Sequence, residues 1–300
     1  MADVAYPVTA GAVETACGGD VADYVALMKP RVMFLVVFTA LVGLVAAPGS
    51  MHPVLAIAAL VCIAVGAGAA GALNMWFDAD IDAAMARTAS RPIPRGRVSP
   101  EEARAFGTVL AAGSVICLGL MANWLAAALL ALTIGFYIFV YTMWLKRTTP
   151  QNIVIGGAAG AVPPLVGWAA ATGRLDITAL ALFGVVFFWT PPHFWALAQV
   201  IKADYARAQI PMLPVVAGER SAKRQSVAYA VLTAIVSVIP FLTRSAGDVY
   251  LAGAIVLGVG LVGLTVLDLS GRRWTRRLFA YSIVYVALLF LLFAISPFLP

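Results

Sequence analysis

The chain has 300 residues, of which 62% are hydrophobic and only 11% are charged. A soluble domain usually has about a quarter of its residues charged, and so little charge around a soluble core would leave large exposed apolar patches. The composition therefore excludes an ordinary soluble protein. The net charge of +6 does not indicate nucleic acid, because the basic residues lie in short segments between apolar runs, where they set orientation or meet anionic lipids and ligands.

The N-terminal segment 1–22 contains three acidic residues and no basic stretch before an apolar core, so it is a poor signal peptide. We expect a disordered tail over 1–22 and one intramembrane domain over 23–300. The three cysteines are far apart in the sequence, which predicts neither a disulfide framework nor a metal cluster.

Long apolar runs predict an all-α polytopic membrane protein with nine transmembrane helices. The expected spans are 24–47, 53–77, 105–121, 123–144, 152–171, 177–200, 226–243, 249–268 and 277–297. With the N-terminus inside, 18 of the 20 basic residues fall in inner loops, and only Arg174 and Arg244 lie outside. This distribution follows the positive-inside rule. The two long inner loops, 78–104 and 201–225, follow the second and sixth spans, as a parallel internal repeat would place them.

The inner end of the second span carries three polar side chains at four-residue spacing: Asn74, Asp78 and Asp82. On an α-helix these three share one face, here called the polar face, whereas Asp80 points elsewhere. Clustered carboxylates repel one another unless a cation lies among them, and Mg²⁺ takes a few carboxylates together with phosphate oxygens and water. The alternative is a helix end that reaches water and carries solvated acids.

Basic residues follow this face and close the fourth span. They are Arg87, Arg91, Arg95, Arg97, Lys146 and Arg147. Acids that bind a metal beside guanidinium groups that bind oxyanions suit a diphosphate. The alternative is that these residues only set membrane orientation.

The sixth span ends in a similar way, with His193 in an aromatic stretch and then Lys202, Asp204 and Tyr205. Asp204 is a candidate for a second metal or diphosphate contact, although Ala208 leaves no second acid four residues later. His193 is either a ligand or a structural residue bonded to a carbonyl that Pro191 and Pro192 release from the helix.

Several of these segments resemble the UbiA superfamily of intramembrane prenyltransferases, and within it the heme-modifying farnesyltransferases. The similar segments are Asn74–Asp82 with Arg87-Thr88 and Arg91-Pro92, Lys29-Pro-Arg-Val32, Lys146–Gly157, Trp189–Ala198, and Asp204-Tyr205 leading to Pro211-Met-Leu-Pro214. The resemblance extends from about residue 23 to the C-terminus. The lone Asp204 departs from the two-acid second motif of many superfamily members, though not from the heme-modifying ones.

The resemblance implies nine helices around a central cavity, with farnesyl diphosphate and heme B as substrates, heme O as product, and Mg²⁺ as cofactor. The charge distribution predicts a multi-pass protein with its N-terminus cytoplasmic and its C-terminus outside, and an N-terminus unlike a transit peptide favours a bacterial inner membrane. The downstream heme A synthase is a candidate partner. The expected catalytic and metal-binding residues are Asn74, Asp78, Asp82 and Asp204. The expected diphosphate-binding residues are Arg87, Arg91, Lys146, Arg147 and Lys202, and the expected heme-binding residues are His193 and Tyr205.

Two other functions stay open at this stage. One is prenylation of a quinone precursor such as 4-hydroxybenzoate, which the segments around His193 and Pro211 argue against. The other is a transporter, since intramembrane acids often line ion paths; here, however, the acids cluster at one end of the spans.

Overall fold

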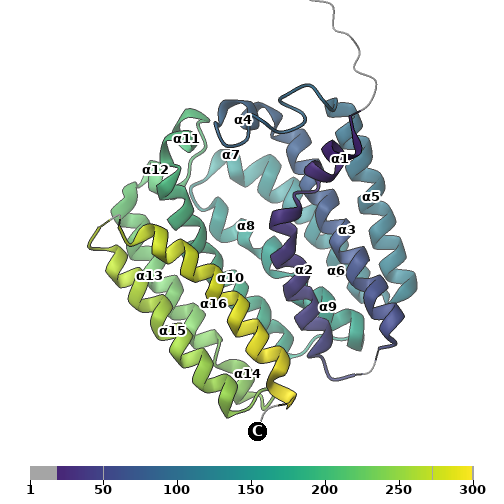
Figure 1. Cartoon of the computed structure of the whole chain (residues 1–300), viewed down its shortest axis with the longest axis vertical. Helices are drawn as coiled ribbons and strands as arrows, with labels where there is room; N and C mark the ends of the chain where they lie inside the picture. Colours follow the sequence, from purple (N-terminus) through teal and green to yellow (C-terminus); the bar gives the residue numbers. More distant parts are fainter. Residues whose placement is uncertain (1–18, 50, 272, 299–300) are drawn as a thin grey trace, which may run out of the picture.

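The computed structural model describes residues 19–49, 51–271 and 273–298, and these form helices and no strands (Figure 1). The helices are α1 (Val21–Leu27), α2 (Pro30–Val45), α3 (Pro53–Phe77), α4 (Ala79–Ala84), α5 (Pro100–Met121), α6 (Trp124–Gly135), the π-helix η1 (Phe136–Leu145), α7 (Lys146–Thr148), α8 (Asn152–Ala161), α9 (Pro163–Thr172), α10 (Ile177–Val200), α11 (Lys202–Arg207), α12 (Leu213–Val216), α13 (Gly218–Val236), α14 (Ile239–Leu242), α15 (Asp248–Asp268), α16 (Thr275–Ile295) and the 3₁₀ helix η2 (Ser296–Phe298). Most of the expected tail, residues 1–18, lies outside the described residues, and α1 already begins at Val21.

Within the described residues, eight helical segments are long and apolar enough to cross a membrane. A ninth span forms when α1 and α2, which are bent by 55° relative to each other, are counted together. The bend lies at Lys29, which has a left-handed backbone (φ 55°) directly before Pro30, because a residue that precedes proline disfavours the α conformation. The prediction of an all-α polytopic membrane protein is confirmed.

Two helices begin earlier than the apolar runs predicted. The third span starts at Pro100 instead of residue 105, and the seventh at Gly218 instead of residue 226. Ser99 and Glu102 form a capping box that fixes the start of α5. Charged first turns of this kind lie outside an apolar window, so hydrophobicity alone places the helix start too late.

The central helices hold the two halves of the chain together. Figure 1 shows α2, α3 and α5 on one side, α13, α15 and α16 on the other, and α8 and α10 between them. Helix α10 packs against α8, α13 and α16, and α2 packs against α9. A Cβ on Gly43 would lie 2.1 Å from the Pro164 carbonyl oxygen, and one on Gly167 would lie 2.0 Å from that of Ala40. Glycine at these two positions therefore lets the α2 and α9 backbones approach closely.

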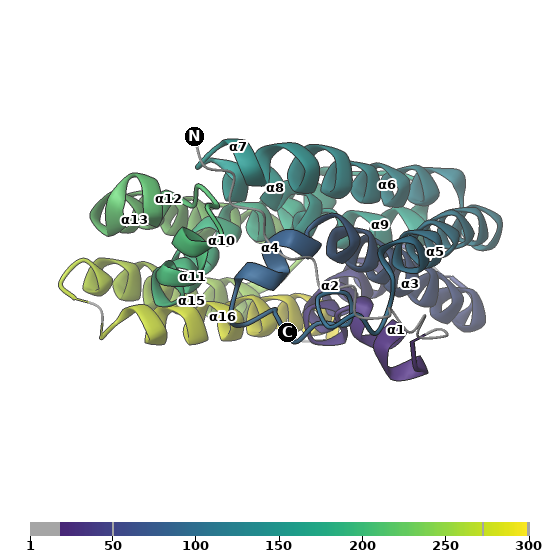
Figure 2. The same cartoon turned by 90° about the horizontal axis from the view of Figure 1, so that it is seen from above.

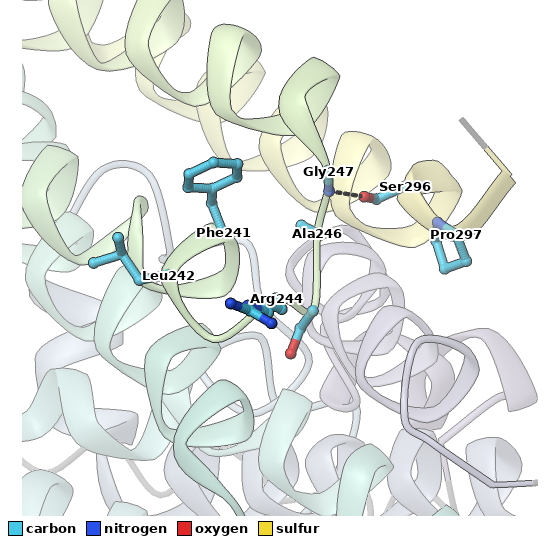
Figure 3. A pocket seen from close by; sticks show the side chains of 8 residues that line it. Phe241, Leu242, Arg244, Ala246, Gly247, Ser296 and Pro297 are labelled. Carbon is cyan, nitrogen blue, oxygen red and sulfur yellow. Dashed lines mark hydrogen bonds between the residues drawn. The ribbon is translucent and has the colours of Figure 1, made fainter. Parts of the chain in front are cut away.

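The two ends of the bundle differ in character. Helices α4 and α11 lie together at one end, which we call the charged end, and Figure 2 shows them side by side near the middle of the view. The opposite end has a hollow of about 550 Å³ between the turn after α14 and the start of η2. Arg244 and Ser296 line this hollow, and Ser296 Oγ accepts a hydrogen bond from the Gly247 amide (Figure 3). The polar residues singled out in the sequence lie away from it, at the charged end and in the span that leads to it.

Candidate active site at the charged end

The polar face forms where α3 passes into α4. The Asp78 amide donates to the Asn74 carbonyl (2.9 Å) and the Asp82 amide to the Asp78 carbonyl (2.8 Å), so four-residue spacing continues across the junction. Asn74, Asp78 and Asp82 are 4%, 0% and 2% exposed, whereas the Asp80 side chain is 64% exposed. Solvated acids at a simple helix end would be exposed, so the burial disfavours that alternative.

Each carboxylate of this region is matched by a basic side chain from another segment. Lys146 forms an ion pair with Asp78, and Arg91 Nη1 lies 2.8 and 2.7 Å from the two Asp82 oxygens. Arg147 donates to both oxygens of Asp80, at 2.8 and 2.7 Å, and this hydrogen bonding lowers the pKa of Asp80. Because a buried carboxylate without a partner is strongly destabilising, the cations fix the two acids at this site.

Four further residues that line the polar face had no role assigned from the sequence. Lys29 donates to Asn74 Oδ1 from the bend between α1 and α2, and the Asn74 amide nitrogen lies 3.0 Å from Thr142 Oγ1. Tyr137 and Tyr141 stack on each other at 5.4 Å on η1, and both lie within electrostatic range of Asp78. A π-helix often marks a functional site. The sequence signals here were the Lys29-Pro dipeptide and tyrosines four residues apart in an apolar span.

The residues predicted at the end of the sixth span are Lys202, Asp204 and Tyr205, and of these Tyr205 lies near the polar face. Tyr205 is buried in a group that includes Ile81 and Met85, next to α4. Burial raises the pKa of Tyr205, while the charges of Arg87 and Arg91 act in the opposite direction, which places the phenol within range of both. Arg87 itself is exposed.

The other two members of that cluster have local partners. Asp204 pairs with Arg207 three residues later, at 3.2 Å, and Lys202 Nζ lies 3.8 Å from a Glu219 oxygen. Neither side chain reaches Asp78 or Asp82 through a hydrogen bond or ion pair between described residues.

His193 lies in the span that leads to this end, between two aromatic rings. It stacks on Trp189 at 4.3 Å and on Phe279 at 4.8 Å, and its Nδ1 lies 2.8 Å from Ser282 Oγ. The single hydroxyl hydrogen of Ser282 goes to the Phe279 carbonyl (2.7 Å), so Nδ1 must be the donor to Ser282. The structural partner of Nδ1 is thus a hydroxyl on α16 rather than a carbonyl released by the prolines. This tautomer leaves a lone pair on Nε2.

The donor atoms of the polar face suit Mg²⁺, which prefers carboxylate and amide oxygens and keeps some water and phosphate ligands. Among the described residues, no three His, Cys, Asp or Glu side chains converge on a point that could hold a metal. Asp204 therefore does not join Asp78 and Asp82 in a protein-only cage. Two carboxylates and one amide fit a metal that is also bound by its substrate.

Together the fold and the site define a multi-pass membrane protein with buried acids and basic side chains at one end. The sequence profile described as the UbiA prenyltransferase family matches residues 36–283. The chain belongs to this family.

Similar proteins agree with this assignment. The chain is 53% identical over 287 residues to "Protoheme IX farnesyltransferase" of Parvibaculum lavamentivorans, covering 94% of this chain and 90% of the relative. It is 57% identical over 279 residues to the protein of the same name from Brucella ovis, covering 89% and 88%.

Solved structures share the fold at low identity. A digeranylgeranylglyceryl phosphate synthase superposes with a TM-score of 0.77 at 16% identity, covering 92% of this chain and 97% of that one. A UbiA homologue from Archaeoglobus fulgidus, bound to DMAPP and Mg²⁺, superposes with a TM-score of 0.68 at 16% identity, covering 91% and 99%.

Proposed function

We propose that this protein transfers the farnesyl group of farnesyl diphosphate to a vinyl group of heme B, with addition of water, to form heme O and diphosphate. The observation that carries the proposal is the pair of buried carboxylates, Asp78 and Asp82, each held by a basic side chain from elsewhere in the chain. The name shared by relatives at 53–57% identity supports heme as acceptor over a quinone precursor.

The donor site is the polar face with its basic partners. Asn74, Asp78 and Asp82 would hold Mg²⁺, and Asp204 remains a candidate because α11 lies beside α4. When bound, the metal neutralises negative charge on the diphosphate leaving group. Lys146 and Arg91 form ion pairs with the two buried carboxylates, so a metal diphosphate bound to these acids would free the two cations to contact its oxygens. Arg87 and Arg147 lie at the exposed edge of the site, where they would contact further diphosphate oxygens.

The main contribution of the protein to the reaction is electrostatic stabilisation of the leaving diphosphate. The bond between the allylic carbon and the diphosphate oxygen breaks, the electron pair leaves with the diphosphate, and preorganised cations stabilise that charge. The vinyl group attacks the allylic cation, water adds to the resulting cation, and a proton is lost to solvent. Apolar spans exclude bulk water from the farnesyl tail. Tyr205 lies near Arg87 and Arg91, so it contributes to the donor side as well as bordering the acceptor.

The acceptor side is α10 and α16. The Nε2 lone pair of His193 is available as an axial ligand for heme iron, and the Ser282 hydrogen bond orients the ring as a partner to a ligating histidine does. The stacking on Trp189 and Phe279 covers the ring faces, and among the described residues no hydrogen bond reaches Nε2.

The protein then lies in a bacterial inner membrane, and the distribution of basic residues supports an orientation with the charged end and N-terminus in the cytoplasm and the C-terminus outside. An enzyme that consumes heme O, such as a heme A synthase, is the expected neighbour, because so apolar a product passes most readily within the bilayer.

The test is incubation of detergent-purified protein with labelled farnesyl diphosphate, Mg²⁺ and either heme B or 4-hydroxybenzoate. We expect a prenylated heme that carries one oxygen from ¹⁸O-labelled water. Label in 4-hydroxybenzoate instead would assign the quinone-precursor reaction. Absence of product with either acceptor, from protein that binds farnesyl diphosphate, would contradict the proposed function.

A further inference from the structure

A second hollow opens at the charged end, between α10 and the turn that leads into α16. It has a volume of about 480 Å³ and is lined by Gln199, Val200, Arg273, Thr275 and Arg276. None of these residues was assigned a role from the sequence, and none takes part in the contacts of the polar face.

The hollow carries uncompensated positive charge. Among the described residues, neither Arg273 nor Arg276 has a carboxylate within ion-pair distance. The nearby acid is already neutralised, because Asp268 lies 3.2 Å from Lys223 Nζ and accepts a 2.6 Å hydrogen bond from the Thr275 hydroxyl. Two guanidinium groups that have no carboxylate partner among the described residues favour an anion with planar oxygen pairs.

One wall has a polar atom without a partner. Gln199 is 7% exposed, and its amide nitrogen donates to the Trp195 carbonyl, yet no described residue donates to its buried side-chain oxygen Oε1. A buried carbonyl left unpaired is costly, so a bound group or an ordered water is expected to donate to it.

The hollow and His193 lie along one seam between α10 and α16. His193 and Val200 are seven residues apart, as are Thr275 and Ser282, so each pair shares a helix face and is separated by about 10 Å along the axis. Ser282 and Phe279 contact His193, while Val200 and Thr275 line the hollow. The seam thus connects the His193 imidazole, whose Nε2 has no hydrogen-bond partner among the described residues, to a pair of arginines about two helical turns away.

We propose that this hollow binds the propionate carboxylates of the porphyrin acceptor, with Arg273 and Arg276 as their cationic partners. The inference rests on the proposed function and adds a second contact for the heme beside the axial bond from His193. The spacing between His193 and the arginines is comparable with that between the iron and the propionates of a porphyrin. Gln199 Oε1 would accept from a protonated propionic acid or from a water held between the two.

The test compares heme B with its dimethyl ester, which lacks both carboxylates, by absorbance titration of the purified protein. We expect wild type to bind heme about 10- to 100-fold more tightly than the ester, as charged hydrogen bonds allow. The double variant Arg273→Gln/Arg276→Gln should lose this preference while binding the ester and farnesyl diphosphate as before. Arg277→Gln is the matched control, because Arg277 lies over the same Trp274 ring as Arg273 but does not line the hollow. Arg276→Lys should keep part of the preference.

An unchanged preference for heme over the ester in the double variant overturns the proposal, as does a wild type that binds both equally. If the double variant instead loses stabilisation by phosphatidylglycerol vesicles and keeps its heme preference, the hollow is a lipid-phosphate site and the proposal is again overturned. Product formation by wild type is scored separately. Wild type that shows the preference but makes no prenylated heme supports the carboxylate site and contradicts the proposed function.

Discussion

The charged ends of α3 and α10 look alike in sequence but not in structure. At the end of α3, Asp78 and Asp82 are buried, and each forms an ion pair with a basic side chain, Lys146 or Arg91. At the end of α10, Asp204 pairs with its neighbour Arg207, and among the described residues Gln199 Oε1 and Trp195 Nε1 have no hydrogen-bond partner. The paired charges at the end of α3 suit a charged ligand, whereas the end of α10 leads from His193 to the hollow lined by Gln199 and Val200. The first half therefore suits the diphosphate donor and the second half the acceptor.

Loss of a buried acid from the first region should give the largest effect. Asp78→Ala removes a donor atom for the metal and leaves Lys146 without its partner, so we expect turnover to fall by at least ~10²-fold. Asp82→Ala should behave in the same way through Arg91. Labelled farnesyl transfer to heme, measured on protein purified from the membrane, gives the values.

Asp80→Ala is the matched control, because Asp80 is exposed and lies two residues from each buried acid. It should lower turnover by only a few-fold. Comparable activity in Asp78→Ala and wild type would contradict the assignment of the polar face to the diphosphate.

Some of this site could be predicted from the sequence, and some could not. The four-residue spacing of Asn74, Asp78 and Asp82 predicts a shared face because helix periodicity is local. Asp204 forms an ion pair with Arg207 on its own helix. Sequence spacing alone does not predict whether Asp204 pairs with Arg207 or binds a metal at the other cluster. The hydrogen bond between Asn74 and Thr142 depends on the π-helix η1. A π turn has one residue more than an α turn, and the apolar pattern of this span does not predict where such turns occur.

Removing the basic partner of a buried acid should weaken the binding of one substrate and not of the other. Lys146→Gln or Arg91→Gln should weaken farnesyl diphosphate by about 10-fold or more and change heme affinity little, because their charges lie at the donor site. Lys202→Gln is the control, since Lys202 lies near Glu219 instead. Binding is measured for each substrate alone.

If heme affinity falls instead, these basic residues contact the propionates and the division between the two regions is reversed. The variant Asp78→Asn/Lys146→Gln checks for a folding effect. It removes both charges of the pair, so its thermal stability should exceed that of Lys146→Gln, which leaves the buried Asp78 carboxylate with only the longer 3.4 Å ion pair to Arg147.

The acceptor region is tested at His193. His193→Ala should shift the absorption bands of bound heme and weaken its binding, because the axial nitrogen is lost. Ser282→Ala should keep the ligand and alter the bands less, since it removes only the hydrogen bond that orients the ring. Unchanged bands and heme affinity in His193→Ala, together with lower protein stability, would leave a purely structural histidine.

The smallest expected effect concerns Tyr205, which joins the two regions. Its ring packs beside α4 and its phenol lies within range of Arg87 and Arg91. Tyr205→Phe keeps the ring and removes one hydroxyl, so we expect KM for farnesyl diphosphate to rise about 3- to 10-fold, the value of one hydrogen bond. The heme absorption bands should stay as in wild type. Tyr229→Phe is a suitable comparison, because Tyr229 packs with Trp195 on the α13 side of α10. A change in the heme absorption bands with an unaltered KM would show that Tyr205 contacts heme, as the sequence analysis expected. The heme-binding region would then extend to α4.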